Sequence, residues 1–273
     1  MTDLAMTDLL VRKHAPDARG VVVEVTPKLA GWDHVGFRVQ RLAAGETATG
    51  REDGREACLV VLTGKADIAV AGQRFTGLGG RASVFDAEAP GAVYAPAGAD
   101  WSAAAITDVE LAVCTAPGTG AGAPRRIEAA SMSQEVRGRG TNTRHVRNIL
   151  PETEPAESLL VVEVITPAGN WSSYPPHKHD TATPGEETAL EETYYHRLRP
   201  PQGFAFQRVY TDDRSLDQTM AVEDGDVVMV PRGYHPVAAP HGYDLYYLNV
   251  MAGPKRQWIF RNDPAHDWIA RKA

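Results

Sequence analysis

Short runs of β-branched and aromatic residues, bounded by glycine, proline and aspartate, recur along the chain and constrain its fold more than any other feature. Such runs are typical of β-strands, because branched and aromatic side chains pack well on a pleated sheet and the flanking residues favour turns. The clearest are the segments 20–25, 58–62, 65–70, 160–165, 204–210, 226–230 and 245–250. Long amphipathic helical patterns are scarce, and strands do not alternate with helices. The pattern therefore predicts an all-β barrel or sandwich rather than a parallel α/β sheet.

The composition is that of a globular protein without an excess of basic residues. The chain has 273 residues, 43% hydrophobic and 23% charged, which is enough for one large or two medium domains with a sizeable core. Its formal net charge is -7 at pH 7. Nucleic acids and anionic membranes attract an excess of lysine and arginine, so this charge argues against either partner.

Nothing in the sequence indicates secretion or membrane insertion. No apolar run approaches the roughly 20 residues that cross a bilayer, and the acidic N-terminus lacks the charged-then-apolar plan of a signal peptide. The opening Met-Thr-Asp-Leu occurs twice, which leaves Met1 and Met6 both open as the start. Cys58 and Cys114 lie in apolar segments and are expected to be buried, reduced thiols. These features predict a cytoplasmic protein.

A segment rich in glycine, alanine and proline divides the chain. Residues 116–124 read Ala-Pro-Gly-Thr-Gly-Ala-Gly-Ala-Pro, a composition that favours neither helix nor strand. We therefore expect two domains, at residues 1–120 and 121–273.

The two halves echo each other around a Pro-x-Gly turn. Residues 93–100 read Val-Tyr-Ala-Pro-Ala-Gly-Ala-Asp, and residues 229–235 read Met-Val-Pro-Arg-Gly-Tyr-His. Aligning the turns places Asp100 opposite His235, yet the first half has no His-x-His motif. The echo predicts a duplicated β-domain in which only the second copy carries a site, although chance similarity of two turn signals is the alternative.

Three histidines and a carboxylate in the second half form a candidate metal site. His177 and His179 are two residues apart, so in an extended strand both side chains point to one side. His235 follows the second Pro-x-Gly turn, and Glu191 and Glu192 lie in another strand-like segment. Three nitrogens and one oxygen suit zinc, manganese, iron or nickel and leave positions open for a substrate.

The choice between the two glutamates depends on which face of their strand enters the barrel. Glu192, Tyr194 and His196 share one face, and Glu191 lies on the other. Glu192 is the preferred ligand because its face brings a phenol and an imidazole into the site. Glu191 stays open as the alternative.

The order His-x-His, then Glu, then Pro-x-Gly followed by His resembles the signature of the cupins, and two such units make a bicupin. The resemblance is densest over about 135–260, with Tyr-Pro-Pro-His-Lys-His-Asp at 174–180, Glu-Glu-Thr-Tyr-Tyr-His-Arg at 191–197 and Val-Pro-Arg-Gly-Tyr-His-Pro-Val at 230–237. These runs resemble the 5-deoxy-glucuronate isomerases of bacterial myo-inositol catabolism, a family of bicupin uronate isomerases. The insertion at 180–190 and a turn shorter by one residue before the last histidine depart from the general cupin pattern, and both are similar to features of the uronate isomerases.

The resemblance implies an all-β bicupin of two double-stranded β-helix (jelly-roll) barrels, the N-terminal one degenerate. It implies an isomerase that interconverts an aldose and a ketose, turning 5-deoxy-D-glucuronate into 2-deoxy-5-keto-D-gluconate, with a divalent metal ion stabilising an enediolate. The implied ligands are His177, His179, Glu192 and His235, and the ion's identity among zinc, manganese, iron and nickel stays open.

Isomerisation also needs a base that moves a proton between neighbouring carbons. Tyr194, His196 and Glu191 are the candidates, and the sequence does not choose among them.

Cationic side chains are candidate partners for the carboxylate of a uronate, because guanidinium groups bind carboxylates in a bidentate way and ammonium groups act as point charges. Arg208, Arg232 and Lys178 are the candidates. The basic segment 137–147 is expected to form a structural strap or a wall of the active site.

Two other functions remain open at this stage. One is another metal-dependent cupin enzyme, either an oxygenase or the uronate ketol-isomerase of pectin breakdown. The other is a sugar-binding cupin without catalysis. For the isomerase, we expect a small-molecule uronate as partner, no nucleic acid, no membrane and a possible homo-oligomer.

Overall fold

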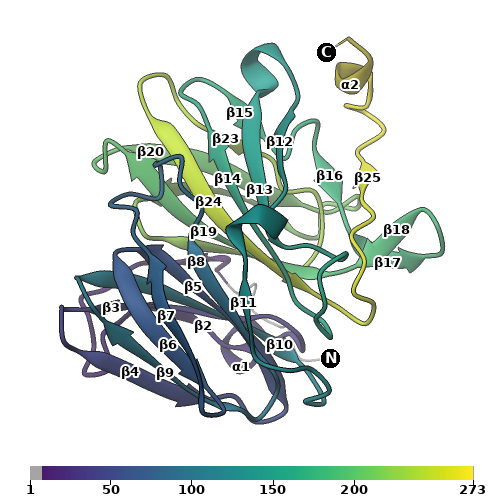
Figure 1. Cartoon of the computed structure of the whole chain (residues 1–273). Helices are drawn as coiled ribbons and strands as arrows, with labels where there is room; N and C mark the ends of the chain where they lie inside the picture. The colour runs from purple at the N-terminus through teal and green to yellow at the C-terminus, as the bar shows by residue number, and fades with distance from the viewer. Residues whose placement is uncertain (1–7, 273) are drawn as a thin grey trace.

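The chain folds into two β-barrels, each built from a larger and a smaller sheet (Figure 1). The structure is a computed structural model that describes residues 8–272; Met1 and Met6, the two candidate starts, lie outside this range. The all-β prediction is confirmed, and each of the seven segments predicted as strands overlaps a strand of the structure.

The N-terminal barrel occupies the lower part of Figure 1. Its larger sheet has the strand order β11 (Arg125–Ile127), β8 (Gly91–Ala95), β5 (Arg55–Thr63), β10 (Val109–Pro117), β3 (Gly36–Leu42) and β2 (Val21–Val25). Its smaller sheet has the order β4 (Thr47–Arg51), β9 (Asp100–Ala105), β6 (Lys65–Val70) and β7 (Gln73–Gly79).

The C-terminal barrel carries the candidate metal site. Its larger sheet has the strand order β1 (Leu10–Val11), β22 (Val227–Val230), β19 (Glu191–Arg199), β24 (Asp244–Ala252), β14 (Leu160–Thr166), β13 (Arg144–Leu150) and β12 (Gln134–Arg137). Its smaller sheet has the order β15 (Trp171–Ser172), β23 (Val237–Ala238), β20 (Phe204–Tyr210) and β21 (Asp217–Glu223).

Short elements complete the fold. Two small ladders pair β16 (His177–Lys178) with β25 (Arg261–Asn262) and β17 (Asp180–Thr183) with β18 (Glu187–Ala189). The helical elements are α1 (Pro27–Ala30), α2 (Trp268–Lys272) and the 3₁₀ turns η1 (Ala129–Ser131) and η2 (Gly140–Asn142).

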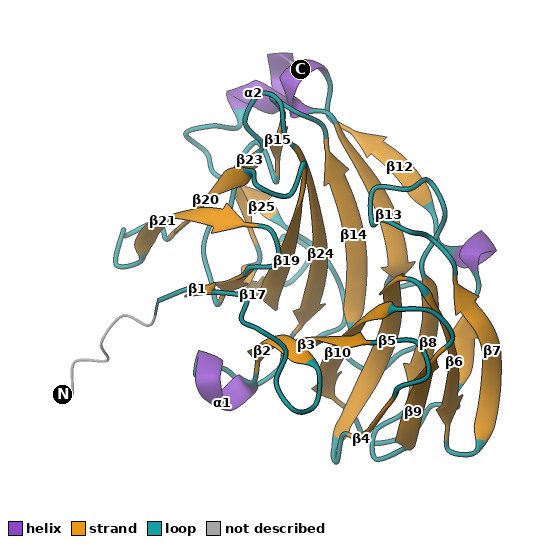
Figure 2. Cartoon of the chain, turned by 90° about the vertical axis from the view of Figure 1, so that its left-hand side faces the viewer, coloured by secondary structure: helices purple, strands orange, loops and turns teal. Residues whose placement is uncertain are grey.

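The two halves exchange a strand. β1, near the start of the chain, pairs with β22 of the C-terminal barrel, with Leu10 opposite Val228. Figure 2 shows β1 on the side of that barrel, near β19. β11, which follows residue 120, pairs with β8 of the N-terminal barrel. Strand pairing therefore crosses the predicted boundary at residue 120 in both directions. The division into two domains, at 1–120 and 121–273, stays a prediction.

The interior of the N-terminal barrel is filled by apolar side chains, many of them alanine and valine. Trp101 is 3% exposed and lies directly against Gly50, where a Cβ atom would come within 2.4 Å of the indole ring. Asp100, which the sequence echo aligns with His235, is exposed on the surface. A tryptophan thus occupies space inside the N-terminal barrel, consistent with a degenerate copy.

A second apolar core joins the halves, because buried residues of β3 and β5 pack in the same cluster as those of β19 and β24. Cys58 and Cys114 are free, buried and opposite each other on β5 and β10, which confirms the predicted reduced thiols. Burial raises the pKa of Cys58 to about 12, so the thiol is unreactive at neutral pH. Within residues 8–272, none of the helices has the length and apolar character that a membrane span requires.

A buried carboxylate adds a polar bond between the halves. Glu56 of β5 is fully buried and accepts hydrogen bonds from the Tyr94 hydroxyl and from the backbone N–H groups of Glu157, Ser158 and Leu159. Buried carboxylates are stable only when they are paired in this way.

Candidate metal centre in the C-terminal barrel

His177 and His179 both point into the C-terminal barrel, as their spacing predicts. His177 lies on β16 and is 8% exposed, and His179 follows that strand and is 2% exposed. Their ring centroids are 6.3 Å apart.

His235 reaches the same place from a tight turn. Gly233 has a φ of +91°, and a Cβ atom there would lie 2.4 Å from the carbonyl oxygen of Tyr210, so the turn requires glycine. His235 is fully buried, and its Nδ1 lies 2.9 Å from the Gly233 carbonyl oxygen. A carbonyl only accepts hydrogen bonds, so Nδ1 carries the proton and Nε2 keeps a lone pair for a ligand. Nε2 has no hydrogen-bond partner among the described residues.

Glu192 completes the cluster from β19. Its Oε2 lies 3.2 Å from Nε2 of His179 and 3.2 Å from Nε2 of His235, and the glutamate is 2% exposed. The ligand atoms of His177, His179 and His235 all lie within 4.8 Å of one another. Within residues 8–272 this is the one such grouping of at least three histidine, cysteine or acidic residues. The structure thus brings together all four residues that the sequence predicts as ligands.

The electrostatics of the cluster suit a cation. Burial, together with the neighbouring histidines, holds the pKa of His177 well below its usual value, and burial lowers that of His235 to about 4. Burial opposes protonation of His179 as well, but the hydrogen bond and charge of Glu192 raise the pKa of that imidazole overall. His177 and His235 are thus neutral imidazoles, and Nε2 of His235 has no hydrogen-bond partner among the described residues. Together with the buried pair of His179 and Glu192, they fit a divalent ion with nitrogen and oxygen ligands.

Glu191 points away from the cluster. Its carboxylate accepts hydrogen bonds at 2.9, 2.7 and 2.9 Å from the backbone N–H groups of Asp33, His34 and Val35 in the N-terminal half. The structure therefore does not bring this candidate base to the site, and Glu191 secures the contact between the halves instead.

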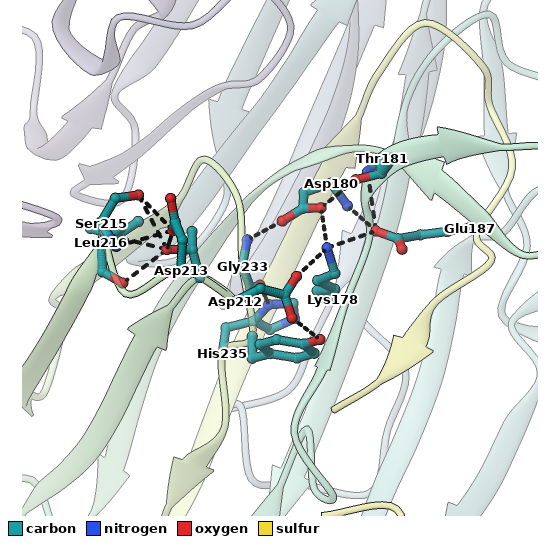
Figure 3. Close-up of polar contacts among 12 residues, drawn as sticks. Lys178, Asp180, Thr181, Glu187, Asp212, Asp213, Ser215, Leu216, Gly233 and His235 are labelled. Atoms are coloured by element: carbon teal, nitrogen blue, oxygen red, sulfur yellow. Dashed lines mark hydrogen bonds and ion pairs between the residues drawn. The ribbon is translucent and has the colours of Figure 1, made fainter. Parts of the chain in front are cut away.

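Lys178 also points away from the cluster, because it lies between the two histidines on the opposite face. Its Nζ is 2.9 Å from Oδ1 of Asp180, 3.0 Å from Oδ2 of Asp212 and 4.0 Å from Oε1 of Glu187 (Figure 3). Asp180 in turn accepts a hydrogen bond of 2.7 Å from the backbone N–H of Gly233. The lysine and these carboxylates thus link the His-x-His segment to the turn before His235.

Replacing Lys178 with methionine is expected to weaken binding of a divalent ion by about 10-fold, the lower end of what outer partners of metal ligands contribute. The three neighbouring carboxylates lose their cation. Their mutual repulsion loosens the hydrogen bond from the Gly233 N–H to Asp180, which holds the turn before His235. Competition with a coloured chelator measures the affinity, and the exposed Lys65→Met is the control. An unchanged affinity in Lys178→Met would contradict this role.

The two arginines predicted to bind the substrate carboxylate lie outside the cluster. Arg208 makes a bidentate ion pair with Asp217, at 2.7 and 2.6 Å, on the outside of the barrel. Arg232 is exposed in the turn before His235.

Tyr194 and His196 lie deeper in the barrel, on the same face of β19 as Glu192. The Tyr194 ring centroid is 5.7 Å from that of His235, and the His196 ring stacks on Tyr194 at 5.9 Å. The Tyr194 hydroxyl lies 2.8 Å from the Ser173 hydroxyl oxygen, and His196 Nε2 lies 2.9 Å from Gln207 Oε1. Tyr194 is therefore next to the cluster, and the His196 ring is linked to it through that of Tyr194.

A cavity of about 420 Å³ opens beside His177. Its lining includes Arg139, Asn142 and Arg144 of the basic segment 137–147. The sequence marks this segment as basic but does not distinguish one of its arginines from another. The other lining residues are Gly138, Tyr174, Pro175, Phe260, Asn262 and Ala270.

A larger hollow of about 1070 Å³ lies over the N-terminal barrel, away from the histidines. Its arginines already have partners, since Arg38 binds Glu52 at 2.7 Å and Arg41 lies 3.6 Å from Glu110. Of these two cavities, the smaller one is therefore the one that lies beside a candidate metal ligand, His177, and is lined by arginines without ion-pair partners among the described residues.

Comparisons with known proteins show which family the chain is similar to. The model of the KduI/IolB family matches residues 9–269. The chain is 55% identical over 264 residues to a 5-deoxy-glucuronate isomerase of Geobacillus kaustophilus, covering 97% of this chain and 96% of that one. It is 49% identical over 253 residues to a 5-deoxy-glucuronate isomerase of Bacillus subtilis strain 168, covering 92% and 93%.

Solved structures show the same fold. The crystal structure of an IolB-like protein from Salmonella typhimurium LT2 superposes with a TM-score of 0.93 at 52% identity, covering 96% of this chain and 99% of that one. Bacillus subtilis oxalate decarboxylase superposes with a TM-score of 0.65 at 14% identity, covering 94% and 80%, a likeness of fold alone that confirms the predicted bicupin architecture. The match over nearly the whole chain, with relatives of about half-identical sequence, shows that the chain belongs to the KduI/IolB family.

Proposed function

We propose that the chain is an aldose–ketose isomerase that converts 5-deoxy-D-glucuronate to 2-deoxy-5-keto-D-gluconate in myo-inositol degradation. We propose further that His177, His179, Glu192 and His235 hold the divalent ion on which the reaction depends. The observation that carries the proposal is the convergence of these four side chains, beside a cavity, in a chain whose relatives are named for this activity.

A divalent ion in this cluster would act as a Lewis acid that stabilises negative charge on two neighbouring oxygens of the sugar. The barrel residues supply the proton chemistry. Burial and the charge of Glu192 raise the pKa of Tyr194 well above its usual value, so the phenol keeps its proton at neutral pH and can donate to a sugar oxygen.

The hydrogen-bond network supports His196 as the base. The Gln207 amide nitrogen donates to the His235 carbonyl oxygen at 3.4 Å, so the Gln207 Oε1 is the acceptor for His196 Nε2. The proton of His196 therefore sits on Nε2. Its Nδ1 is left as a buried acceptor without a partner among residues 8–272. In this role Nδ1 takes the proton from one carbon and returns it to the next.

Turnover followed by NMR tests the proposed function. Purified protein should convert 5-deoxy-D-glucuronate to the 5-keto acid, and in heavy water some deuterium should appear at the carbon that receives the proton. Turnover of an unsaturated-uronate product instead, or oxygen consumption, would support the two rival enzymes. Binding of the sugar without conversion would support a non-catalytic cupin.

A pair of neighbouring substitutions tests the choice of carboxylate ligand. Glu192→Gln is expected to weaken binding of the ion by more than about 100-fold, beyond what loss of an outer partner costs. Glu191→Gln, the matched control, should keep the ion. It should lower the free energy of unfolding by about 1–2 kcal/mol, because three backbone donors lose a charged acceptor. Elemental analysis and urea unfolding measure the two effects, and the reverse pattern would assign the ligand to Glu191.

We also infer that the protein works in the cytoplasm, which the two buried, reduced cysteines support. A homo-oligomer stays a prediction, which light scattering of the purified protein tests.

A further inference from the structure

We propose that Arg144 binds the carboxylate of the sugar acid and so sets which end of the substrate faces the metal cluster. This inference rests on the proposed function. It replaces Lys178 and Arg208 in that role, because both already bind carboxylates of the chain itself.

Arg144 and His177 line the same cavity of about 420 Å³, and the His177 ring lies 4.6 Å from that of Phe260, which lines the cavity too. A six-carbon sugar acid in open-chain form spans about 6 Å from end to end, given carbon–carbon bonds of about 1.5 Å. The cavity is large enough for such a chain to have its aldehyde end at His177 and its carboxylate on the basic wall.

The Arg144 guanidinium is held in place, but only part of it is used by hydrogen bonds within the chain. Its Nη1 donates to the backbone carbonyl oxygens of Tyr174 at 3.1 Å and of Asn142 at 3.2 Å. No carboxylate within residues 8–272 forms an ion pair with Arg144, and no described hydrogen bond uses its Nε or Nη2. Those two nitrogens form the edge with which arginine binds a carboxylate in a bidentate way.

Arg144 is partly buried, and burial lowers its pKa below the usual value for arginine. A partly buried cation without an ion-pair partner attracts an anion that enters the cavity. Arg139 also lines the cavity, but it is exposed and its charge is solvated. Arg137 of the same segment does not line the cavity; it pairs with Glu135 and stacks on the Trp258 ring at 4.8 Å.

The test is a comparison of two substrates in one variant. Arg144→Met is expected to lower kcat/KM for 5-deoxy-D-glucuronate by about 100-fold, mostly through KM, since charge-assisted hydrogen bonds of this kind contribute up to about 3 kcal/mol. For 5-deoxy-D-glucose, in which a neutral CH₂OH group replaces the carboxylate, kcat/KM should change less than about threefold. Arg144→Lys keeps the positive charge but not the planar pair of guanidinium donors, so it should recover part of the lost kcat/KM.

Controls separate binding from folding. The exposed Arg74→Met should match the wild type, and metal content and unfolding temperature should be unchanged in Arg144→Met. If that variant does not fold, Arg144→Gln, which keeps a donor for the Tyr174 carbonyl, takes its place.

The possible outcomes distinguish failure of the proposed function from failure of the Arg144 inference. A wild type that does not convert the deoxy-uronate overturns the proposed function itself. An active wild type with an equally active Arg144 variant overturns this inference alone, as does an equal loss on the charged and the neutral sugar.

Discussion

Replacing His177 and His179 together with alanine is expected to remove the bound divalent ion and to abolish isomerase activity while the fold persists. Two of the four proposed ligands disappear, and the remaining pair, Glu192 and His235, cannot hold an ion with native affinity. The loss of activity should exceed about 1000-fold, because the stabilisation of charge that the ion supplies amounts to several kcal/mol.

Elemental analysis and the NMR assay measure the two effects, and circular dichroism shows whether the β-fold is retained. The matched control is His14→Ala, which removes an exposed histidine near the start of the chain. A double variant that still carries about one ion per chain would contradict the assignment of the ligands.

Replacing Arg81 with methionine is expected to lower the free energy of unfolding by about 3 kcal/mol. The Arg81 side chain is fully buried in the N-terminal half, and its guanidinium binds Glu163 of β14 at 3.1 and 2.9 Å. Removing one member of a buried ion pair leaves the other charge without its main partner. Arg147 and the Tyr246 hydroxyl still bind Glu163, which keeps the loss at the lower end of the usual range.

Urea unfolding measures this effect through the midpoint of the transition. Arg51→Met, which breaks an exposed ion pair with Asp53, is the control and should leave the midpoint unchanged. Adding Glu163→Gln to Arg81→Met should recover part of the loss, since the uncompensated charge is then gone. An unchanged midpoint in Arg81→Met would show that this ion pair does not stabilise the contact between the halves.

The fold was predictable because its signals are local. Strands such as 58–62 and 245–250 carry their β-branched and aromatic residues within a few positions of one another, and both are strands in the structure. The pairing of Leu10 with Val228 was not predictable, because two residues of sequence do not specify a partner more than 200 positions away.

The site could be predicted from the sequence where the spacing of residues along a strand determines which way their side chains point. His177 and His179 point into the barrel because side chains alternate along a strand, and the same alternation separates Glu192 from Glu191. The family resemblance is confirmed by the matches over nearly the whole chain.

The cationic residues were less predictable, since their roles depend on distant partners. Lys178 was expected to bind substrate, yet its partners include Asp212 from another loop. Arg144 belongs to a segment that the sequence marks only as basic. Which member of that segment faces the cavity depends on the path of the chain around η2 and on the carbonyl oxygens of Tyr174 and Asn142.

The most direct test is to measure bound metal and turnover of 5-deoxy-D-glucuronate in the same samples as a chelator removes the ion. We expect about one divalent ion per chain at the start, activity that falls in proportion to the ion lost, and recovery when the ion is returned. Full activity in protein freed of metal would contradict the account.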